Sequence, residues 1–531
     1  MITWQMCINA IKKLIRNQQL IAYYLLLITG SGCAVSDHSF SPGKKYSPEQ
    51  LQKDFSIYEG ILEEAHPGLY WYTSKDSMDQ YFSEAKQQLK DSMTESEFRK
   101  VLSRVTSKIG CGHTAVRTSK AFAKYRDTVG INSVFPLSLK IWSPDNSIKN
   151  DTAVVTANLN RKDSILSRGT IITKINDQPI SAIASRIFGY LPTDGYNLTH
   201  KYQVLSNRGS FGALYSSVYG LSDQYNIEYI DSTGAIKNTS IKPYYPATDS
   251  IGMAILRATL RSSQFSRKER KEVRKNSARL LKMDTAAHVA MMDLNYFGRG
   301  YGLKGFFRRS FKTLNQRNIN YLIIDVRNNG GGSPTNSTYL TRFISDHKFK
   351  IGDSLYAVKK KKKYKKYIQG DFWNRLFITF FAKKKKDGYY HIGYFERHYF
   401  KPRKRYHFDG KVYILSGGNS FSATTLFISA LINQENVTVI GEETGGGAYG
   451  NSAWHIPTVT LPETKVRFNL PLYRLVIDKN MPKTGLGVQP EVKALPTVQA
   501  IRKGIDYKLE VATEMIKQDK ERSAPTQPST H

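Results

Sequence analysis

The sequence predicts a multi-domain protein with an α/β core. Apolar, β-branched runs predict buried strands at 321–326 (YLIIDV), 412–415 (VYIL) and 437–441 (VTVIG). The segment 302–320 has apolar residues at helical spacing, with Phe306, Phe307, Phe311 and Leu314 on one side. Because a further strand is expected within 287–297, strands alternate with helices, which indicates β-α-β units.

Ser422 lies where the strand at 412–415 gives way to a helix with the sequence FSATTLFISALI. A hydroxyl at such a junction can project from the end of the sheet. The helix N-terminus also presents free N–H groups and a positive dipole to a developing oxyanion. Glycines 330–332 end the preceding strand, and their backbone can approach an oxyanion closely. The alternative is that Ser422 only caps the helix, as serine often does.

Three segments carry a resemblance to a known family: IIDVRNNGGG, the Ser-Ala pair after VYIL, and GEETGGG. In this order they resemble the core of the tail-specific, or C-terminal processing, serine peptidases. GLGVQPEV at 485–492 is similar to the closing motif of that family, with Glu491 in place of Asp. The resemblance implies that Ser422 is the nucleophile of an acyl transfer. It also implies that the Ala423 amide and an amide at Gly331 or Gly332 receive the oxyanion.

The general base is where the chain departs from many members of that family. They place a Lys in the loop after the second strand, whereas Gly447 stands there in this chain and no Lys occurs between Lys411 and Lys465. A serine nucleophile needs a base at neutral pH. The tricorn-like branch of the family supplies an upstream histidine, and the motif IGCGHTAVRT implies that His113 has this role.

The third catalytic residue is less well defined by the sequence. In tricorn-like members an acid near the closing motif orients the histidine, which points to Asp478, although LVIDKN could also be a surface turn. Glu442 and Glu443 are alternatives for which we expect a structural role. Cys111 beside the histidine is expected to pack, and we expect a structural role for His66. No metal or organic cofactor is implied.

The segment from about Val134 to Tyr244 contains short strands and the sequence ILSRGTIITKINDQPISAI, which resembles a PDZ module. Such modules add a peptide strand to an exposed sheet edge. An unrelated small β domain is the alternative. We expect six parts: a signal peptide (1–33), a tether and helical domain (34–125), a PDZ-like domain (126–250), a basic linker (251–284), a serine peptidase domain (285–495), and a C-terminal helix with a disordered tail (496–531).

The chain has 531 residues and a formal net charge of +34. This charge suits an anionic membrane surface, and no zinc-binding, helix-turn-helix or RNA-binding pattern favours nucleic acid. Basic residues precede an apolar run that ends at TGSGC, which resembles a bacterial lipoprotein site with lipidation at Cys33. Plain secretion with cleavage near Ser31 is the alternative. We expect export to the envelope of a Gram-negative-type bacterium as an outer-membrane lipoprotein that faces the periplasm or the surface.

Two lysine runs, 359–363 and 383–386, bracket the aromatic segment FWNRLFITFF. This composition is typical of a segment that lies in an anionic interface, with 373, 376, 377 and 380 on one helical face and 372 and 381 beside it. A solvated hairpin whose aromatic residues pack on the core is the alternative. The predicted function is an envelope serine endopeptidase acting on peptides or proteins. An inactive peptide-binding protein and a non-peptide ester or amide hydrolase remain alternatives, and the oligomeric state is open.

Overall fold

The computed structural model describes residues 40–129, 133–145, 147–246 and 266–523. The predicted signal peptide, Cys33, residues 34–39 of the tether and the C-terminal tail from 524 onward lie outside the described residues. No helix within the described ranges is long and apolar enough to cross a membrane.

The N-terminal helical region contains α3 (Pro48–Ala65), α4 (Lys75–Gln87), α5 (Glu95–Lys108) and α6 (Lys120–Thr128). Each begins at a Ser or Thr whose hydroxyl accepts a backbone N–H of the first turn. Strands β1 (Lys45–Tyr46) and β2 (Met93–Thr94) pair beside these helices. Asp54 of α3 accepts hydrogen bonds from the backbone N–H groups of Glu463 and Thr464. Strand β3 (Val116–Arg117) joins β19 (Thr458–Thr460) and β20 (Arg467–Asn469), so this region is bound to a segment far along the chain.

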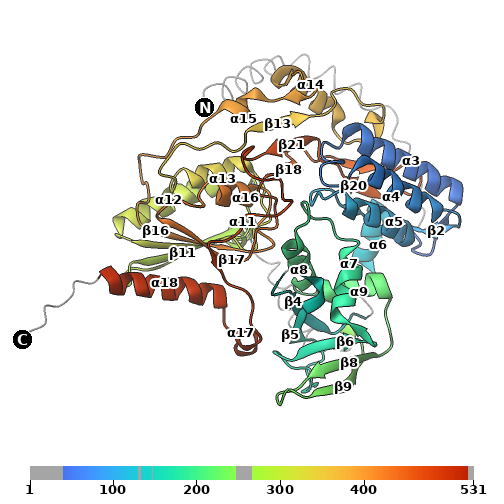
Figure 1. Ribbon diagram of the computed structural model, residues 1–531, viewed down its shortest axis with the longest axis horizontal. Coiled ribbons are helices and arrows are strands. Elements are labelled where there is room, and N and C mark those ends of the chain that lie inside the picture. The colour runs from blue at the N-terminus through green and yellow to red at the C-terminus, as the bar shows by residue number, and fades with distance from the viewer. Residues whose placement is uncertain (1–39, 130–132, 146, 247–265, 524–531) are drawn as a thin grey trace, which may run out of the picture. The chain divides into compact units, whose positions relative to one another are not determined.

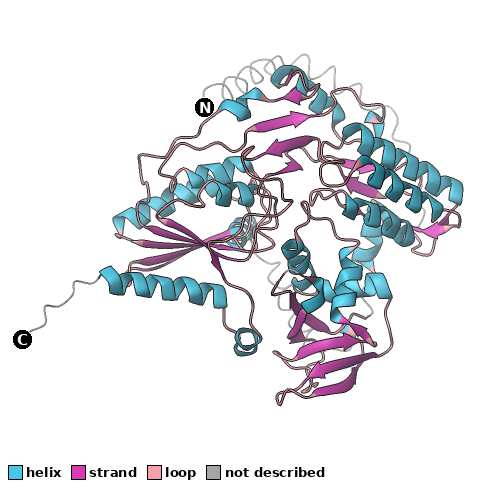
Figure 2. Ribbon diagram, in the orientation of Figure 1, coloured by secondary structure: helices cyan, strands magenta, loops and turns pink. Residues whose placement is uncertain are grey.

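The PDZ-like module is an antiparallel sheet in the order β4-β5-β6-β8-β9, with β7 paired to β6. Its apolar core lies between this sheet and three helices, as Figure 2 shows. The strands are β4 (Leu137–Trp142), β5 (Thr152–Asn158), β6 (Ile171–Ile175), β7 (Gln178–Pro179), β8 (Tyr225–Ile230) and β9 (Ile236–Ile241), and the helices are α7 (Ile180–Phe188), α8 (Leu198–Ser206) and α9 (Ser210–Tyr219).

The peptidase core is a sheet in the order β10-β11-β12-β16-β17-β22, parallel from β11 onward. Helices α12, α13 and α16 cover one face and α18 lies along the other (Figure 1). The bounds are β10 (Arg279–Asp284), β11 (Val289–Leu294), α12 (Leu303–Gln316), β12 (Tyr321–Asp325), α13 (Pro334–Thr341), β16 (Lys411–Ser416), α16 (Ala423–Ser429), β17 (Val437–Gly441), β22 (Val492–Lys493), α17 (Val498–Lys503) and α18 (Tyr507–Ser523).

These elements confirm the predicted alternation of strands and helices. Leu322 and Ile324 of β12 pack under α12, whereas Tyr321 and Ile323 contact the α18 face, as expected for a strand buried on both sides. The predicted linker differs in part. Residues 247–265 lie outside the described residues, 267–278 form helix α11, and 279–284 form the antiparallel edge strand β10.

A second sheet in the order β14-β15-β13-β21-β18 contains the lysine-rich insertion. Its strands come from two segments of the catalytic domain, one before the predicted nucleophile and one after it. The bounds are β13 (Ser354–Ala357), β14 (Lys383–Lys384), β15 (Tyr390–His391), β18 (Gly450–Ala453) and β21 (Tyr473–Val476), with helices α14 (Asp371–Phe381) and α15 (Gly393–Arg397) beside them.

Three loops follow β12, β16 and β17 at the carboxyl edge of the parallel sheet, where active sites of α/β folds usually lie. Gly331 in the first loop has φ +97°, and a Cβ atom there would lie 2.7 Å from Ser422 Cβ and 2.9 Å from Ala423 N. The backbones of the two loops therefore approach to a distance that only glycine allows.

We predict that Gly331→Ala destabilises the protein by about 2–5 kcal/mol. A left-handed alanine costs about 1–2 kcal/mol, and overpacking adds about 1–3 kcal/mol. Thermal unfolding followed by circular dichroism measures the change. Gly330→Ala is the matched control because its Cβ would meet nothing within 4 Å. An equal unfolding midpoint for both variants would contradict the close approach.

Candidate active site

Ser422 occupies the N-cap position of α16 with φ 58° and ψ −119°, a left-handed conformation that is unusual for a residue with a side chain. Its hydroxyl makes no capping hydrogen bond, so the alternative that it only caps the helix is wrong. Such strain at the end of a strand is often found where a side chain must be presented to a substrate. Ser420, two residues earlier, supports the turn because its hydroxyl donates to the Val326 carbonyl at 2.9 Å.

Two backbone amides beside Ser422 are free to bind an oxyanion. Ala423 N–H and Gly332 N–H have no hydrogen-bond acceptor within the part of the chain that the structure describes. Gly331 N–H differs, because it donates to Asn329 Oδ1 at 3.0 Å. The carbonyl of Gly331 also accepts Phe297 N–H at 2.8 Å, which fixes the orientation of this peptide. Of the two glycine amides predicted, Gly332 is therefore the better placed.

His113 reaches the same place from the N-terminal region. Its ring packs on Phe421, the neighbour of Ser422, with ring centroids 4.9 Å apart. Its Nδ1 is enclosed without a hydrogen-bond partner among the described residues. Burial and the nearby His200 lower the pKa of His113, and the charge of Asp194 opposes this shift. The ring therefore stays neutral at neutral pH, the form that a general base requires.

Asp194, on the loop between α7 and α8, is the carboxylate beside His113. Its nearest oxygen lies within 4.8 Å of the ligand atoms of both His113 and Cys111. Its side chain is buried, and the carboxylate accepts Gly112 N–H at 2.9 Å and Gly447 N–H at 3.2 Å. It therefore joins the histidine loop to the glycine-rich loop, at the glycine that replaces the expected lysine.

Asp478 lies elsewhere, in the turn after β21, where its carboxylate accepts Asn480 N–H at 2.8 Å. His113 is not among its contacts in the described ranges. Cys111 is buried, and its Sγ donates to the Ser452 carbonyl at 3.6 Å. Burial and then the charge of Asp194 raise the pKa of this thiol to about 12, so it is not a nucleophile.

His66 is a buried structural histidine. Its Nδ1 accepts Gly68 N–H at 3.1 Å, and its Nε2 lies 2.8 Å from the Thr114 hydroxyl. Burial, followed by the Arg474 charge, lowers its pKa to about 3, so the ring is neutral and Nε2–H donates to Thr114. This contact holds the loop that carries His113 against the first helix pair.

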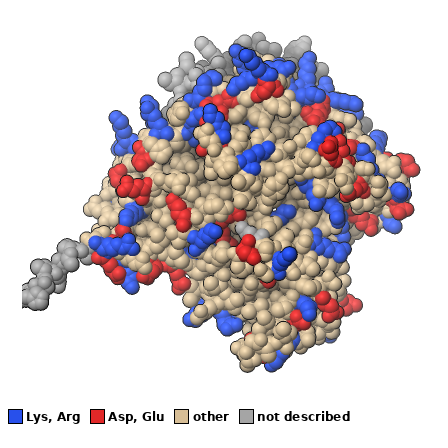
Figure 3. All heavy atoms as spheres, in the orientation of Figure 1, with Lys and Arg blue, Asp and Glu red and all other residues tan. Residues whose placement is uncertain are grey.

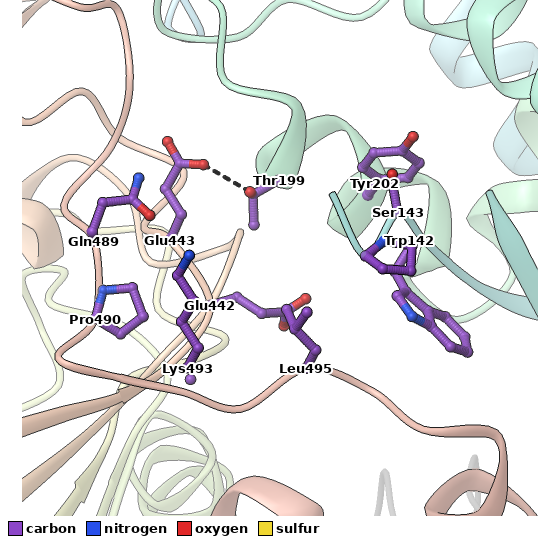
Figure 4. Close-up of a pocket in the computed structure, with 12 residues that line it drawn as sticks. Trp142, Ser143, Thr199, Tyr202, Glu442, Glu443, Gln489, Pro490, Lys493 and Leu495 are labelled. Atoms are coloured by element: carbon purple, nitrogen blue, oxygen red, sulfur yellow. Dashed lines mark hydrogen bonds between the residues drawn. The ribbon is translucent and has the colours of Figure 1, made fainter. Parts of the chain in front are cut away.

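Glu442 and Glu443 have structural partners. Glu442 forms a buried ion pair with Lys508 Nζ at 2.5 Å. Glu443 accepts the Thr199 hydroxyl at 2.9 Å and Gly487 N–H at 2.6 Å. Figure 4 shows the bond to Thr199 at one side of a pocket between the module and the catalytic domain. Both carboxylates thus fix the start of the glycine-rich loop through their contacts with α18, α8 and Gly487.

Asp194 and His200 are site residues that sequence reasoning missed. His200 Nδ1–H donates to the Gly418 carbonyl at 2.7 Å, and its ring also packs on Phe421 at 4.9 Å. Both residues belong to LPTDGYNLTH at 191–200, whose only signal is an Asp-Gly turn before a helix. Nothing in that segment indicates contact with Gly418 and Phe421 or with Gly447, more than two hundred residues away.

The comparisons with known proteins agree with this architecture. Residues 288–494 match the sequence model of peptidase family S41. The structure of mature CPAF is similar over 90% of this chain and 99% of that chain, with 14% identity and a TM-score of 0.60. CPAF complexed with lactacystin gives 14% identity and a TM-score of 0.59 over 89% of this chain and 98% of that chain.

The photosystem II D1 C-terminal processing protease covers 85% of this chain and 97% of its own, with 12% identity and a TM-score of 0.39. No curated protein is significantly similar in sequence. The likeness to CPAF shows a shared fold. The sequence match identifies residues 288–494 as a domain of peptidase family S41, the serine peptidase family whose core the sequence resembles.

Proposed function

We propose that the chain is an endopeptidase of the bacterial envelope that uses Ser422 as its nucleophile and His113 as its base. The observation that supports this best is the junction at Ser422. Ser422 has a strained backbone, and its hydroxyl makes no hydrogen bond to the helix. It lies beside two free amides and next to Phe421, on which the neutral His113 packs.

The chemistry would be acyl transfer. His113 removes the hydroxyl proton of Ser422 as Oγ attacks the peptide carbonyl, and the carbonyl oxygen takes the negative charge. The amides of Ala423 and Gly332 donate to that oxygen. The histidine then gives its proton to the leaving amine, and a water, deprotonated by the same ring, releases the acyl group. The absence of a direct Ser422–His113 hydrogen bond in the described residues fits a site that aligns when substrate binds.

Asp194 is our candidate for the residue that orients His113. Its carboxylate lies within 4.8 Å of the histidine's ligand atom, and its charge favours the imidazolium that forms during catalysis. Asp478, expected from the family order, has no comparable contact. The PDZ-like module would thus contribute a positioning residue to the site.

We predict that Ser422→Ala lowers peptide hydrolysis by about 10⁴-fold or more while the unfolding midpoint stays near that of wild type. The change removes one hydroxyl that has no capping role. Casein and a matched peptide ester serve as substrates, and a fluorophosphonate probe reports the nucleophile directly. Wild-type turnover by a folded variant would exclude the proposal, and ester turnover without peptide turnover would favour a non-peptide hydrolase.

We predict that kcat/KM rises with pH through a group whose pKa is below about 6.5, because burial favours neutral His113. Asp194→Asn removes the charge that raises this pKa, so the acid limb should move to lower pH. The rate should also fall, by up to about 10⁴-fold, because the ring loses its orientation. The matched control is Asp223→Asn, an exposed acid of the same module. An acid limb unmoved by Asp194→Asn would contradict the positioning role.

We also propose that α14 and its flanking lysines hold the enzyme against an anionic membrane. Phe372, Trp373, Phe380 and Phe381 are 56%, 70%, 74% and 50% exposed. The helix face differs from the expected one at Phe377, which packs towards Tyr473 in the core with ring centroids 6.2 Å apart. Figure 3 shows Lys and Arg side chains gathered around this part of the surface.

The charge around this aromatic surface supports an anionic partner. The residues that flank α14 include nine exposed lysines, and each can add about 1 kcal/mol of attraction near an anionic surface. Lys362 is not among them, because it is buried and paired with Asp371 at 2.8 Å. With the expected lipid on Cys33 as a second anchor, an outer-membrane lipoprotein is the location that fits best.

We predict that protein lacking residues 1–33 binds vesicles of phosphatidylglycerol and phosphatidylcholine and loses this binding at high salt. Serine at 372, 373, 380 and 381 should abolish binding and leave casein cleavage unchanged. These substitutions spare Ile368 and Ile378, which belong to the core and would be lost if the whole insertion were replaced. Serine at the exposed Tyr394 and Tyr399 is the control. Undiminished vesicle binding by the first variant would refute the membrane role.

A further inference from the structure

Arg474 is a buried guanidinium with an unmatched charge. It lies on β21, is 2% exposed, and forms no ion pair among the described residues. Its hydrogen bond to the Ser452 hydroxyl, from Nη1, is long at 3.4 Å. Its Nε and Nη2 are both enclosed without an acceptor in the described part of the chain. Burying a charge without a partner is costly, so this arrangement needs an explanation.

Several other buried or half-buried cations among the described residues have carboxylate partners. Buried Arg279 lacks one, but its Nε donates to the Tyr301 carbonyl at 2.8 Å. Lys362 pairs with Asp371 at 2.8 Å, and Lys508 pairs with Glu442 at 2.5 Å. Arg327 gives the most direct comparison, because its Nε and Nη2 bind the two oxygens of Asp325 at 3.0 and 2.6 Å. This edge of a guanidinium is a fork that fits one carboxylate. In Arg474 the same two nitrogens have no acceptor.

Further groups around Arg474 suit an anion. Trp71 stacks on the guanidinium, with Cζ 3.7 Å from the ring centroid, and Lys483 Nζ lies 4.0 Å from the same ring. Stacking covers the face of the guanidinium, whereas the fork donates in its plane. Trp71 Nε1–H and the Tyr72 hydroxyl are also enclosed without partners in the described ranges. Arg474 and Lys483 thus gather beside the unpaired Trp71 N–H and the neutral Tyr72 hydroxyl, and no carboxylate among the described residues pairs with either cation.

The nearest acid of the active site does not fill this role. Asp194 and Arg474 both act on the Cys111 thiol, yet they are not within ion-pair distance of each other among the described residues. Asp194 already accepts two backbone N–H groups. The Arg474 cluster therefore lies next to the loop that carries His113, on the Cys111 side.

The cluster borders the surface. Trp71 and Tyr72 are half-buried, and Lys483 is exposed. Tyr72 also packs against Gly110, where a Cβ would lie 3.0 Å from its ring, three residues before His113. These contacts place the cluster beside the loop that carries His113.

We propose that Arg474, Lys483, Trp71 and Tyr72 form a subsite that binds a carboxylate of the peptide substrate. This inference rests on the proposed peptidase function and gives it a substrate class. The carboxylate belongs either to an acidic side chain or to a free C-terminus. Arg474 would bind both oxygens through its fork, and Lys483 would add a cation at the entrance.

The test uses protein that contains residues 34–531 and carries Ser422→Ala to prevent turnover. Eight-residue peptides carry a fluorophore in four forms, with Asp or Asn at one position and with a free or amidated C-terminus. Fluorescence anisotropy should show about tenfold to hundredfold tighter binding of the form that retains the relevant carboxylate, as expected for a charged bidentate contact. The Asp/Asn and free/amidated pairs identify which carboxylate is bound.

Arg474→Met should remove this preference and leave binding of the neutral peptide unchanged. Lys483→Met, at an exposed position, should reduce the preference even if Arg474→Met does not fold, and Lys479→Met controls for net charge. Equal binding of all four forms, or a preference that survives Lys483→Met and Arg474→Met, would overturn the subsite. Failure of the proposed function gives a different result. Protein that retains Ser422 would then neither react with fluorophosphonate nor cleave peptides, whereas the peptide-binding preference would be unaffected.

Discussion

The packing of the Phe421 ring against two histidine rings is the contact on which the site depends. His113 comes from the N-terminal region and His200 from the PDZ-like module, and both ring centroids lie 4.9 Å from that of Phe421. Aromatic contacts of this kind add about 0.5–1.5 kcal/mol each beyond burial. Since Phe421 precedes Ser422, packing that buries the ring also fixes the strained turn of the nucleophile. Three segments that are distant in sequence are thereby brought to one residue.

Burial around Phe421 also sets the charge state of the neighbouring histidine, because it lowers the pKa of His113. The neutral state of His113 results from its enclosure, and Asp194 limits the shift without an ion pair. The chain compensates its buried Lys508 and Lys362 with carboxylates on the catalytic side and in the insertion. Such pairs contribute little net stability but are costly to break. Arg474 differs from these lysines, because its Nε and Nη2 have no acceptor among the described residues.

The sequence predicted the parallel sheet because its strands carry continuous β-branched runs that only a doubly covered sheet accepts. The family resemblance, and not a local pattern, implied that an amide at Gly331 or Gly332 lies beside Ser422 and that Gly447 replaces the lysine of the family. The sequence did not predict β10, because RLLKMD at 279–284 has polar and apolar residues in no clear alternation. Asp194 was out of reach for a different reason. Its role depends on the docking of one domain against another, which no local pattern encodes.

The segment from 193 to 200, which ends in the first turn of α8, binds the module to the three loops of the candidate active site. Asp194 binds the amides of Gly112 and Gly447, Asn197 binds the Thr444 carbonyl at 2.7 Å, and His200 binds the Gly418 carbonyl. These bonds reach the histidine loop, the glycine-rich loop and the serine loop. A displacement of the module would therefore break contacts in all three loops together.

On the module's own edge strand, β4, the Ser206 hydroxyl hydrogen-bonds with the backbone N–H and C=O of Ile141, groups that an added peptide strand would need. A peptide strand added at that edge would therefore compete with α8 for these two groups.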